Sequence, residues 1–263
     1  MRPVFRRLHS SPLVALLSQW AAPAGVAGAP ASADVAEQLS QWLSTVDAVT
    51  LGRALHAIES LPADAASAVA GPGLDVAALE AAYAQAREEL IALAASRPAS
   101  PRPARERPDN TRADAPDPQA EGEFAWHLPH YIGLQKQLDA RLQALRLQVR
   151  QAMTKGPHRL RQLALLDGVM AQMTAAREQR LWASLPAQLE RRFHQRRDAY
   201  LQRLQALGQE DDVQRWRAPG GWLPAFERDL QALLLAEMQV RLEPIVGLLE
   251  AARNQTVKLE LQE

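Results

Sequence analysis

The chain has 263 residues, 47% of them hydrophobic, which is enough to bury one or two cores and suggests one or two domains. Its 30 basic and 30 acidic side chains cancel, which excludes a strong overall field that would draw the chain to nucleic acid or an anionic membrane. The absence of cysteine excludes disulfides, thiolate metal sites and cysteine nucleophiles.

The opening stretch MRPVFRRLHSSPLVALLSQW fits two interpretations. Its arginines precede a small-residue site as in a secretory signal, but polar residues soon interrupt the apolar run that starts at Leu13. Ser11 and Pro12 suit a helix start instead, and apolar side chains then share one stripe as far as Trp20. We therefore predict a short helix and a soluble, cytoplasmic protein, with export by an N-terminal signal as the alternative.

Residues 1–96 are predicted to form an N-terminal helical part. Apolar residues at three- and four-residue steps predict helix from Ser32 to Pro62, with a restart at Thr50, and again from Asp75 to about Ser96. Proline and charge dominate the residues that follow. The segment 97–123 has no apolar residue larger than alanine, which predicts a disordered linker rich in Pro, Arg and Asp.

The second helical part is predicted over 124–253, followed by a tail at 254–263. Apolar stripes predict four long helices, which run from Pro129 to Gly156, from Pro157 to Pro186, onward to Gly208, and from Pro224 to Arg253 with a kink at Pro244. The expected core positions include Val46, Leu55, Met170, Leu181 and Leu207. The sequence therefore predicts an all-α fold, a coiled-coil-like helical bundle or extended helical hairpins in two parts joined by the linker.

Four blocks carry a resemblance to a bacterial family of unknown function. They are AEQLSQWLSTVDAVTLGRAL at 36–55, LALLDGVM at 163–170 followed by ARE, LPAQLERRF at 185–193, and WLPAFERDLQALLLAEMQVRLEPIVGLLEAARN at 222–254. The resemblance covers most of the chain except the linker and supplies no catalytic residue. The resemblance implies a gene neighbourhood shared with an OmpA-like envelope protein and a proton-channel protein similar to flagellar stators. The resemblance therefore implies a cytoplasmic accessory of an envelope-spanning assembly.

No pattern predicts an enzyme. The chain has no GxxxxGK[ST] phosphate loop, no GxSxG elbow and no HExxH pair. His127 and His130, with Glu123, have a spacing that a metal site can use, but Pro129 lies between the histidines and no second ligand pair follows. We predict no catalytic residue, no cofactor and no metal.

Two acidic residues fall on or beside apolar stripes. Asp167 lies on the stripe of its helix and Asp47 at the edge of another, so each is expected to recruit an arginine, because an unpaired buried charge is costly. Structural pairing is the simpler interpretation, and a partner-binding or proton-linked acid is the alternative. Glu237 and Arg241, four residues apart, are predicted to form a pair on the surface of the last helix.

A basic segment at 190–203 suggests nucleic-acid binding as an alternative function. Its arginines interleave with Phe193, His194 and Tyr200, an arrangement that can neutralise phosphates and stack on bases. The arginines are Arg191, Arg192, Arg196, Arg197 and Arg203. Residues 124–263 carry a net charge of only +5, so a solvated basic face over a buried aromatic seam is favoured.

The main functional prediction is a non-enzymatic helical scaffold or adaptor that docks onto a protein partner. Tryptophan contributes strongly to protein interfaces, so the candidate contacts are Trp20, Trp42, Trp216 and Trp222, although core packing explains each equally well. The partner's identity, the state of self-association, and the continuity of the helices across Pro186 and Pro244 are left open.

Overall fold

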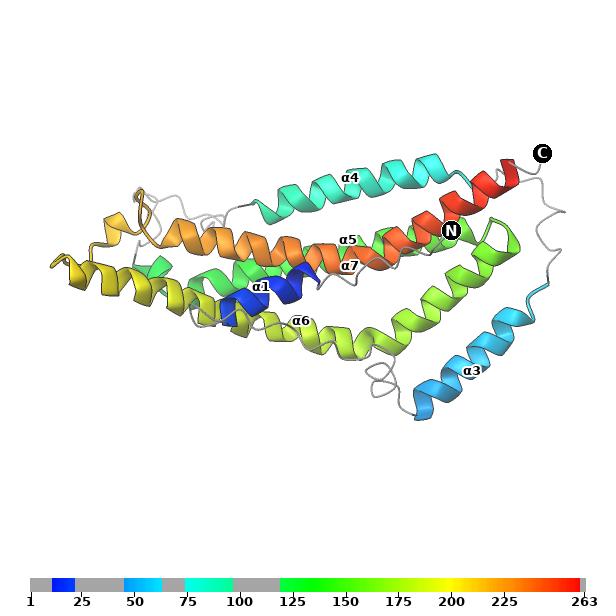
Figure 1. Ribbon diagram of the computed structural model, residues 1–263, viewed down its shortest axis with the longest axis horizontal. Coiled ribbons are helices and arrows are strands. Elements are labelled where there is room, and N and C mark those ends of the chain that lie inside the picture. The colour runs from blue at the N-terminus through cyan, green and yellow to red at the C-terminus, as the bar shows by residue number, and fades with distance from the viewer. Residues whose placement is uncertain (1–10, 22–44, 63–73, 97–118, 261–263) are drawn as a thin grey trace, which may run out of the picture. The chain divides into compact units, whose positions relative to one another are not determined.

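The computed structural model describes residues 11–21, 45–62, 74–96 and 119–260. This part of the chain contains six α-helices, two 3-10 turns and no strand, which confirms the all-α prediction (Figure 1). The helices are α1 (Pro12–Ala21), α3 (Thr45–Glu59), α4 (Val76–Ala94), α5 (Phe124–Met153), α6 (His158–Ala206) and α7 (Leu223–Glu260), and the turns are η1 (Ala120–Gly122) and η2 (Val213–Arg215). The predicted linker lies outside the described residues as far as residue 118.

The chain divides into two compact units. Unit 1 comprises 1–20, 89–139 and 183–238, and unit 2 comprises 21–88, 140–182 and 239–263. Each unit takes segments from both the 1–96 and the 124–263 parts of the chain, and α5, α6 and α7 each contribute to both units.

Two predicted helix boundaries are confirmed. α1 begins at Pro12, where the missing N–H of proline costs nothing. α6 ends just before Gly208, whose φ of 63° lies in the left-handed region that favours glycine. The amide of Gln209 donates to the Leu204 carbonyl and that of Gly208 to the Gln205 carbonyl, which is the Schellman arrangement at a helix end.

Three internal prolines do not end their helices. Pro186 was expected to divide two helices but lies inside the 49-residue α6, so three long helices replace the predicted four. A proline inside a helix loses one hydrogen bond and costs about 3 kcal/mol. At Pro186 the flanking Leu185 and Leu189 are fully buried, which offsets that cost. α5 likewise starts before Pro129, and α7 runs through Pro244 into the predicted tail.

Unit 1 has an aromatic core. Phe193 lies at its centre, with ring centroids 4.9 Å from both Trp222 and Phe226 and 5.8 Å from Phe124. Trp216 packs on Gly122, where an added Cβ would lie 2.6 Å from the indole ring. Only glycine therefore lets η1 approach this closely.

Unit 2 has an aliphatic core. Its buried side chains come mainly from α5 and α7, with α3, α4 and the start of α6 adding a few: Ile58, Leu79, Leu142, Leu145, Val149, Met153, Leu160, Ala164, Leu242, Ile245, Leu248, Leu249 and Ala252. Predicted core residues Val46, Leu55, Met170 and Leu181 are exposed here, and Leu207 is exposed in unit 1. α3 is continuous through Thr50, whose hydroxyl donates to the Val46 carbonyl instead of restarting the helix.

No helix in the described ranges is both long enough and apolar enough to span a membrane.

Candidate functional site

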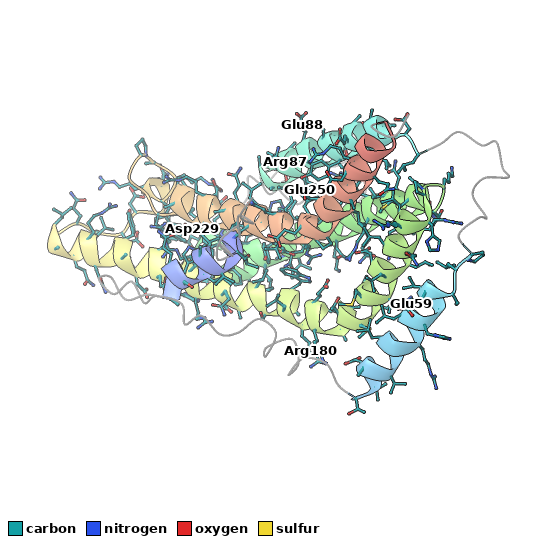
Figure 2. All side chains as sticks on the ribbon, turned by 45° about the vertical axis from the view of Figure 1, so that its right-hand side comes forward. Glu59, Arg87, Glu88, Arg180, Asp229 and Glu250 are labelled. Carbon is teal, nitrogen blue, oxygen red and sulfur yellow. The ribbon has the colours of Figure 1, made fainter. Side chains whose placement is uncertain are left out.

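A buried ion-pair network ties α6 to α7 in unit 1. Asp229 of α7, labelled in Figure 2, accepts hydrogen bonds. The donors are Arg196 Nε at 2.6 Å and Nη2 at 3.0 Å, and Arg192 Nε at 2.8 Å. The Asp229 side chain is only 12% exposed, so its charge needs these partners. The hydrogen bond with Asp229 raises the pKa of Arg196. Asp229 therefore fixes the register of the two helices.

A second network fastens η1 to the loop before α7. Arg217 donates to both oxygens of buried Glu121, at 2.6 and 2.7 Å, and to Glu227 at 2.9 Å. The hydrogen bond with Glu121 is the main reason that the pKa of Arg217 is raised. Bidentate pairing of this kind holds both partners in one geometry.

His127 is fully buried beside this network. Its ring centroid lies 5.0 Å from Phe226 and 5.5 Å from Phe193, and Nε2 lies 2.9 Å from the Glu121 carbonyl oxygen. That contact requires a proton on Nε2. Burial lowers the pKa of His127, although the Glu121 carbonyl opposes the shift. The ring is thus a neutral core histidine in this arrangement.

Glu237 is buried in the core of unit 1. The Tyr131 hydroxyl at 3.4 Å and Gln135 Nε2 at 3.0 Å both donate to its Oε2. Glu237 is 0% exposed, so the prediction that it lies on the surface of the helix is wrong. The Arg241 guanidinium lies over the Trp182 ring, 4.3 Å from the centroid.

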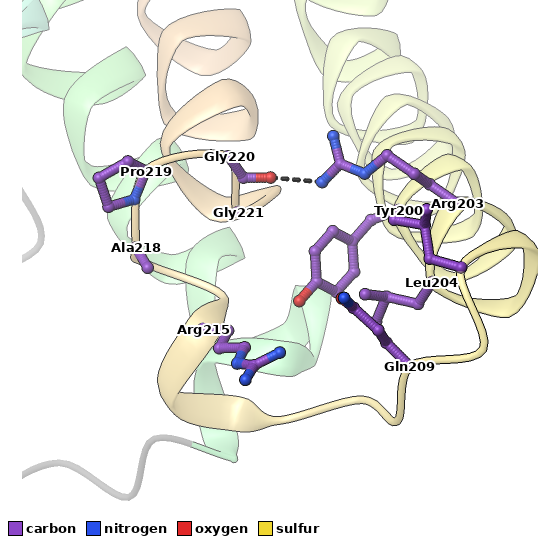
Figure 3. A pocket seen from close by; sticks show the side chains of 10 residues that line it. Tyr200, Arg203, Leu204, Gln209, Arg215, Ala218, Pro219, Gly220 and Gly221 are labelled. Atoms are coloured by element: carbon purple, nitrogen blue, oxygen red, sulfur yellow. Dashed lines mark hydrogen bonds between the residues drawn. The ribbon is translucent and has the colours of Figure 1, made fainter.

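The five predicted basic-patch residues are mostly engaged inside unit 1. Besides the two arginines at Asp229, Arg197 donates to the Gly122 carbonyl at 3.1 Å and Arg203 donates to the Gly220 carbonyl at 2.5 Å (Figure 3). Arg192 also lies over the Trp20 ring at 5.5 Å. Arg191 is exposed. Beneath them Phe193 and Tyr200 are buried, as the aromatic-seam interpretation expected.

The candidate tryptophans lie inside the protein where they are described. Trp20, Trp216 and Trp222 are all buried in unit 1, which agrees with the core-packing interpretation. Trp216 Nε1 also donates to Asp211 Oδ1 at 2.7 Å. Trp42 lies outside the described residues.

Both predicted acid–arginine pairs are present in unit 2. Arg146 binds Asp167 through Nε at 2.9 Å and Nη2 at 2.5 Å, which joins α5 to α6. Arg177 of α6 approaches Asp47 of α3 at 3.4 Å in a more exposed pair.

In the part of the chain that the structure describes, the unit 2 half of α6 has an apolar stripe that is only partly covered: Met170 and Leu181 are exposed, and Leu166 and Met173 are half-buried. Leu166, Met170, Met173 and Leu181 recur at helical spacing and form what we call the open α6 face. No residue is buried in the fully described stretch from Leu165 to Trp182. Met170 is 36% exposed and Leu181 49% exposed. Figure 2 labels Arg180, another exposed residue of this stretch.

α3 shows how a helix lies on α6. Its single buried residue is Ile58, and carbonyls in its last turn and in the three residues that follow it accept hydrogen bonds from three α6 side chains. These contacts are His158 to Leu61 at 3.0 Å, Arg161 to Pro62 at 3.2 Å, and Gln162 to Ile58 at 3.1 Å. With the Asp47–Arg177 pair at the other end, they set the two helices antiparallel.

Among the described residues four ionisable groups are buried: sequence reasoning missed Glu121 and Asp229, and it named His127 and Glu237 without predicting their burial. Asp229 directly precedes Leu230 on the apolar stripe of α7, and this position could have indicated that its carboxylate is buried. Glu121 gave no such signal because it precedes the helix. Among described residues no group of three or more His, Asp or Glu side chains is placed to hold a metal ion. His130 instead contacts the Ser96 carbonyl at 3.2 Å.

A family model described as "Protein of unknown function (DUF3348)" matches residues 3–254. The chain therefore belongs to the DUF3348 family. No curated protein and no solved structure matches it significantly.

Proposed function

We propose that this member of the DUF3348 family is a helical adaptor whose open α6 face binds an amphipathic helix of a partner protein. The observation that carries the proposal is the run from Leu165 to Trp182, in which leucine, methionine and valine side chains occur and none is buried. Contiguous exposed apolar surface of this kind is typical of interaction sites.

The spacing of the open α6 face suits a helical partner. Its four residues lie at steps of three, four and eight, which places them within one narrow stripe. A partner helix can match such a stripe with its own apolar residues at the same spacing. Met170 and Met173 have unbranched, polarizable side chains that adapt to different partner surfaces.

The arginines of the basic segment 190–203 favour an adaptor over a nucleic-acid-binding protein. Arg192, Arg196, Arg197 and Arg203 already donate to acceptors within unit 1, so phosphate binding would compete with those contacts. The envelope-associated assembly implied by the family resemblance is where we propose to look for the partner first.

Site-specific photo-crosslinking tests the proposal. A photoreactive amino acid replaces Met170 in one variant and Val14, an exposed apolar residue of α1, in the control. We expect the Met170 position alone to capture a partner peptide, and Leu181→Glu to abolish that product. The captured peptide is then synthesised and must bind the purified chain with a gain of helical circular dichroism.

Two results would contradict the proposal. One is capture at Met170 no greater than at Val14. The other is capture of only a second copy of the chain, together with a dimer in solution by light scattering.

A further inference from the structure

In unit 2, α3 lies alongside the first half of α6 and covers part of its apolar stripe (Figure 1). At one end Gln162 of α6 donates to the Ile58 carbonyl at 3.1 Å. At the other end Arg177 of α6 approaches Asp47 at 3.4 Å. Residues at three- and four-residue steps between these two α6 contacts share one face of the helix. They are Leu166, Val169 and Met173, and all three are half-buried.

The facing stripe of α3 contains few buried side chains. Leu51 and Ala54 share one face with Asp47 and Ile58, because the four residues follow at steps of four, three and four. Both Leu51 and Ala54 are only half-buried, and Ile58 is the single buried residue of α3. Elements with few buried apolar contacts open locally at a low free energy. The packing of α3 on α6 is therefore easily undone.

The two ends of α3 are held unequally. At the C-terminal end three α6 side chains donate hydrogen bonds to carbonyls of the α3 segment. At the N-terminal end the pair of Arg177 and Asp47 has side chains that are 40% and 25% exposed, and exposed pairs contribute little to stability. Val46 and Val49, near this end, are 73% and 51% exposed. The N-terminal half of α3 is thus able to leave α6 while its C-terminal end stays attached.

A partner helix along the whole open α6 face would meet α3, because Leu166 and Met173 belong both to that face and to the stripe under α3. We propose that α3 is a displaceable ligand of its own chain, and that the partner helix has the α3 pattern. This pattern is an acidic residue followed by apolar residues four, seven and eleven positions later. The partner's acid would pair with Arg177 in place of Asp47. The inference rests on the proposed function, because it states how the same face is regulated.

Thiol labelling measures whether α3 leaves α6. The chain has no cysteine, so Met173→Cys introduces a single thiol under α3, and Gln172→Cys introduces an exposed control thiol one position away. We expect Asp47→Arg, and likewise Arg177→Asp, to speed maleimide labelling at position 173 at least threefold. The two substitutions together should restore slow labelling, because they re-form the ion pair with its charges exchanged. The thiol at position 172 should react at the same rate in all four chains.

Peptide binding tests recognition of the α3 pattern. The probe is a fluorescein-labelled peptide of residues 45–62, measured by fluorescence anisotropy on the full chain. The chain with Asp47→Arg should bind this probe at least tenfold more tightly than the unmodified chain, because its own α3 no longer pairs with Arg177. A probe that itself carries Asp47→Arg should bind that chain at least tenfold more weakly than the unmodified probe does.

A covalent bridge tests whether α3 and the probe compete. A bismaleimide linker joins Asp47→Cys to Arg177→Cys, and this should weaken binding of the 45–62 peptide at least tenfold relative to the same chain without the linker. The matched control joins Glu80→Cys to Arg253→Cys, whose native side chains approach to 4.0 Å between α4 and α7. The control bridge should leave peptide binding unchanged.

The inference is overturned if the thiol at position 173 reacts at one rate in all variants, or if bridged and unbridged chains bind the peptide equally well. It is also overturned if labelling at position 172 accelerates together with that at 173, because α6 itself would then be loosened. Labelling and peptide binding as expected, without partner capture at Met170, would support the inference and count against the proposed function alone.

Discussion

Units 1 and 2 share α6 but bury its two halves differently. In unit 1 the α6 stripe of Leu185, Leu189, Phe193, Tyr200 and Leu204 is entirely buried, whereas in unit 2 only Leu160 and Ala164 are. The two halves have similar apolar spacing in the sequence. The two halves of α6 therefore differ in the packing of other helices against them. Apolar periodicity identifies a helix face that can be buried, but it does not say which element packs on that face.

The units also differ in how they hold polar groups. In the described ranges the buried acidic and histidine side chains, Glu121, His127, Asp229 and Glu237, belong to unit 1, and so do the aromatic pairs around Phe193. A directional network of this kind favours one arrangement of helices over alternatives. Unit 2 relies on aliphatic packing; its Arg146–Asp167 pair is as little exposed as the Arg192–Asp229 pair of unit 1, whereas its Arg177–Asp47 pair is more exposed.

The largest contrast is expected between Phe193→Ala and Leu181→Ala. The first removes the central ring of unit 1 and should lower the free energy of unfolding by about 4 kcal/mol, whereas exposed Leu181 should change it by less than about 0.5 kcal/mol. Urea unfolding followed by circular dichroism measures both. Equal effects would show that α6 is covered alike in the two units.

Asp229→Asn probes the buried network. The substitution removes the carboxylate that pairs with Arg192 and Arg196. We expect the free energy of unfolding to fall by about 3 kcal/mol. Asp212→Asn is the matched control, because its pair with Arg215 is exposed and such pairs contribute about 0.5 kcal/mol or less. Urea unfolding measures both variants. Similar losses of stability would contradict the claim that the buried Asp229 pairs stabilise the fold more than the exposed Asp212 pair.

Gly122→Ala tests the close approach of η1 to Trp216. The added methyl group would lie 2.6 Å from the indole ring. We therefore expect the free energy of unfolding to fall by about 2 kcal/mol and the tryptophan fluorescence to change. Gly133→Ala in α5 is the control, since a Cβ there meets nothing within 4 Å and alanine favours helix by about 0.8 kcal/mol. An unchanged melting temperature for Gly122→Ala would contradict the packing described.

The smallest effect concerns pH and His127. Its folded-state pKa is lowered, so below about pH 6.5 the unfolded chain binds a proton that the folded chain does not. Stability should therefore fall as the pH falls through that value, by at most about 1.4 kcal/mol per pH unit from this group. His127→Gln should remove that slope and His130→Gln should not. If the free energy of unfolding varies with pH in the same way for the unmodified chain and for His127→Gln between pH 5 and 8, His127 does not cause the pH dependence.

Helix content was predictable because apolar periodicity, proline and glycine are local signals. The ends of α1 and α6 followed from Pro12 and Gly208, and the Asp167–Arg146 pair followed from a carboxylate on an apolar stripe. Pro186 misled the prediction because its local cost is offset by tertiary burial of Leu185 and Leu189.

The networks of unit 1 were not predictable from spacing. Glu121 meets Arg217 across a sequence separation of 96 residues, and nothing local to either residue encodes that meeting. The open α6 face was misread for the same reason, since Met170 and Leu181 have the pattern of core residues and are nevertheless exposed.

Methionine oxidation tests the central claim most directly. Met170 is 36% exposed, whereas Met153 and Met238 are buried at 0% and 5%. Brief peroxide treatment with mass spectrometry should oxidise Met170 well before the other two in the purified chain, and Met170 should become protected once the crosslinked partner peptide is bound. Equal oxidation of the three methionines in the free chain, or unchanged oxidation of Met170 in the complex, would contradict a docking face on α6.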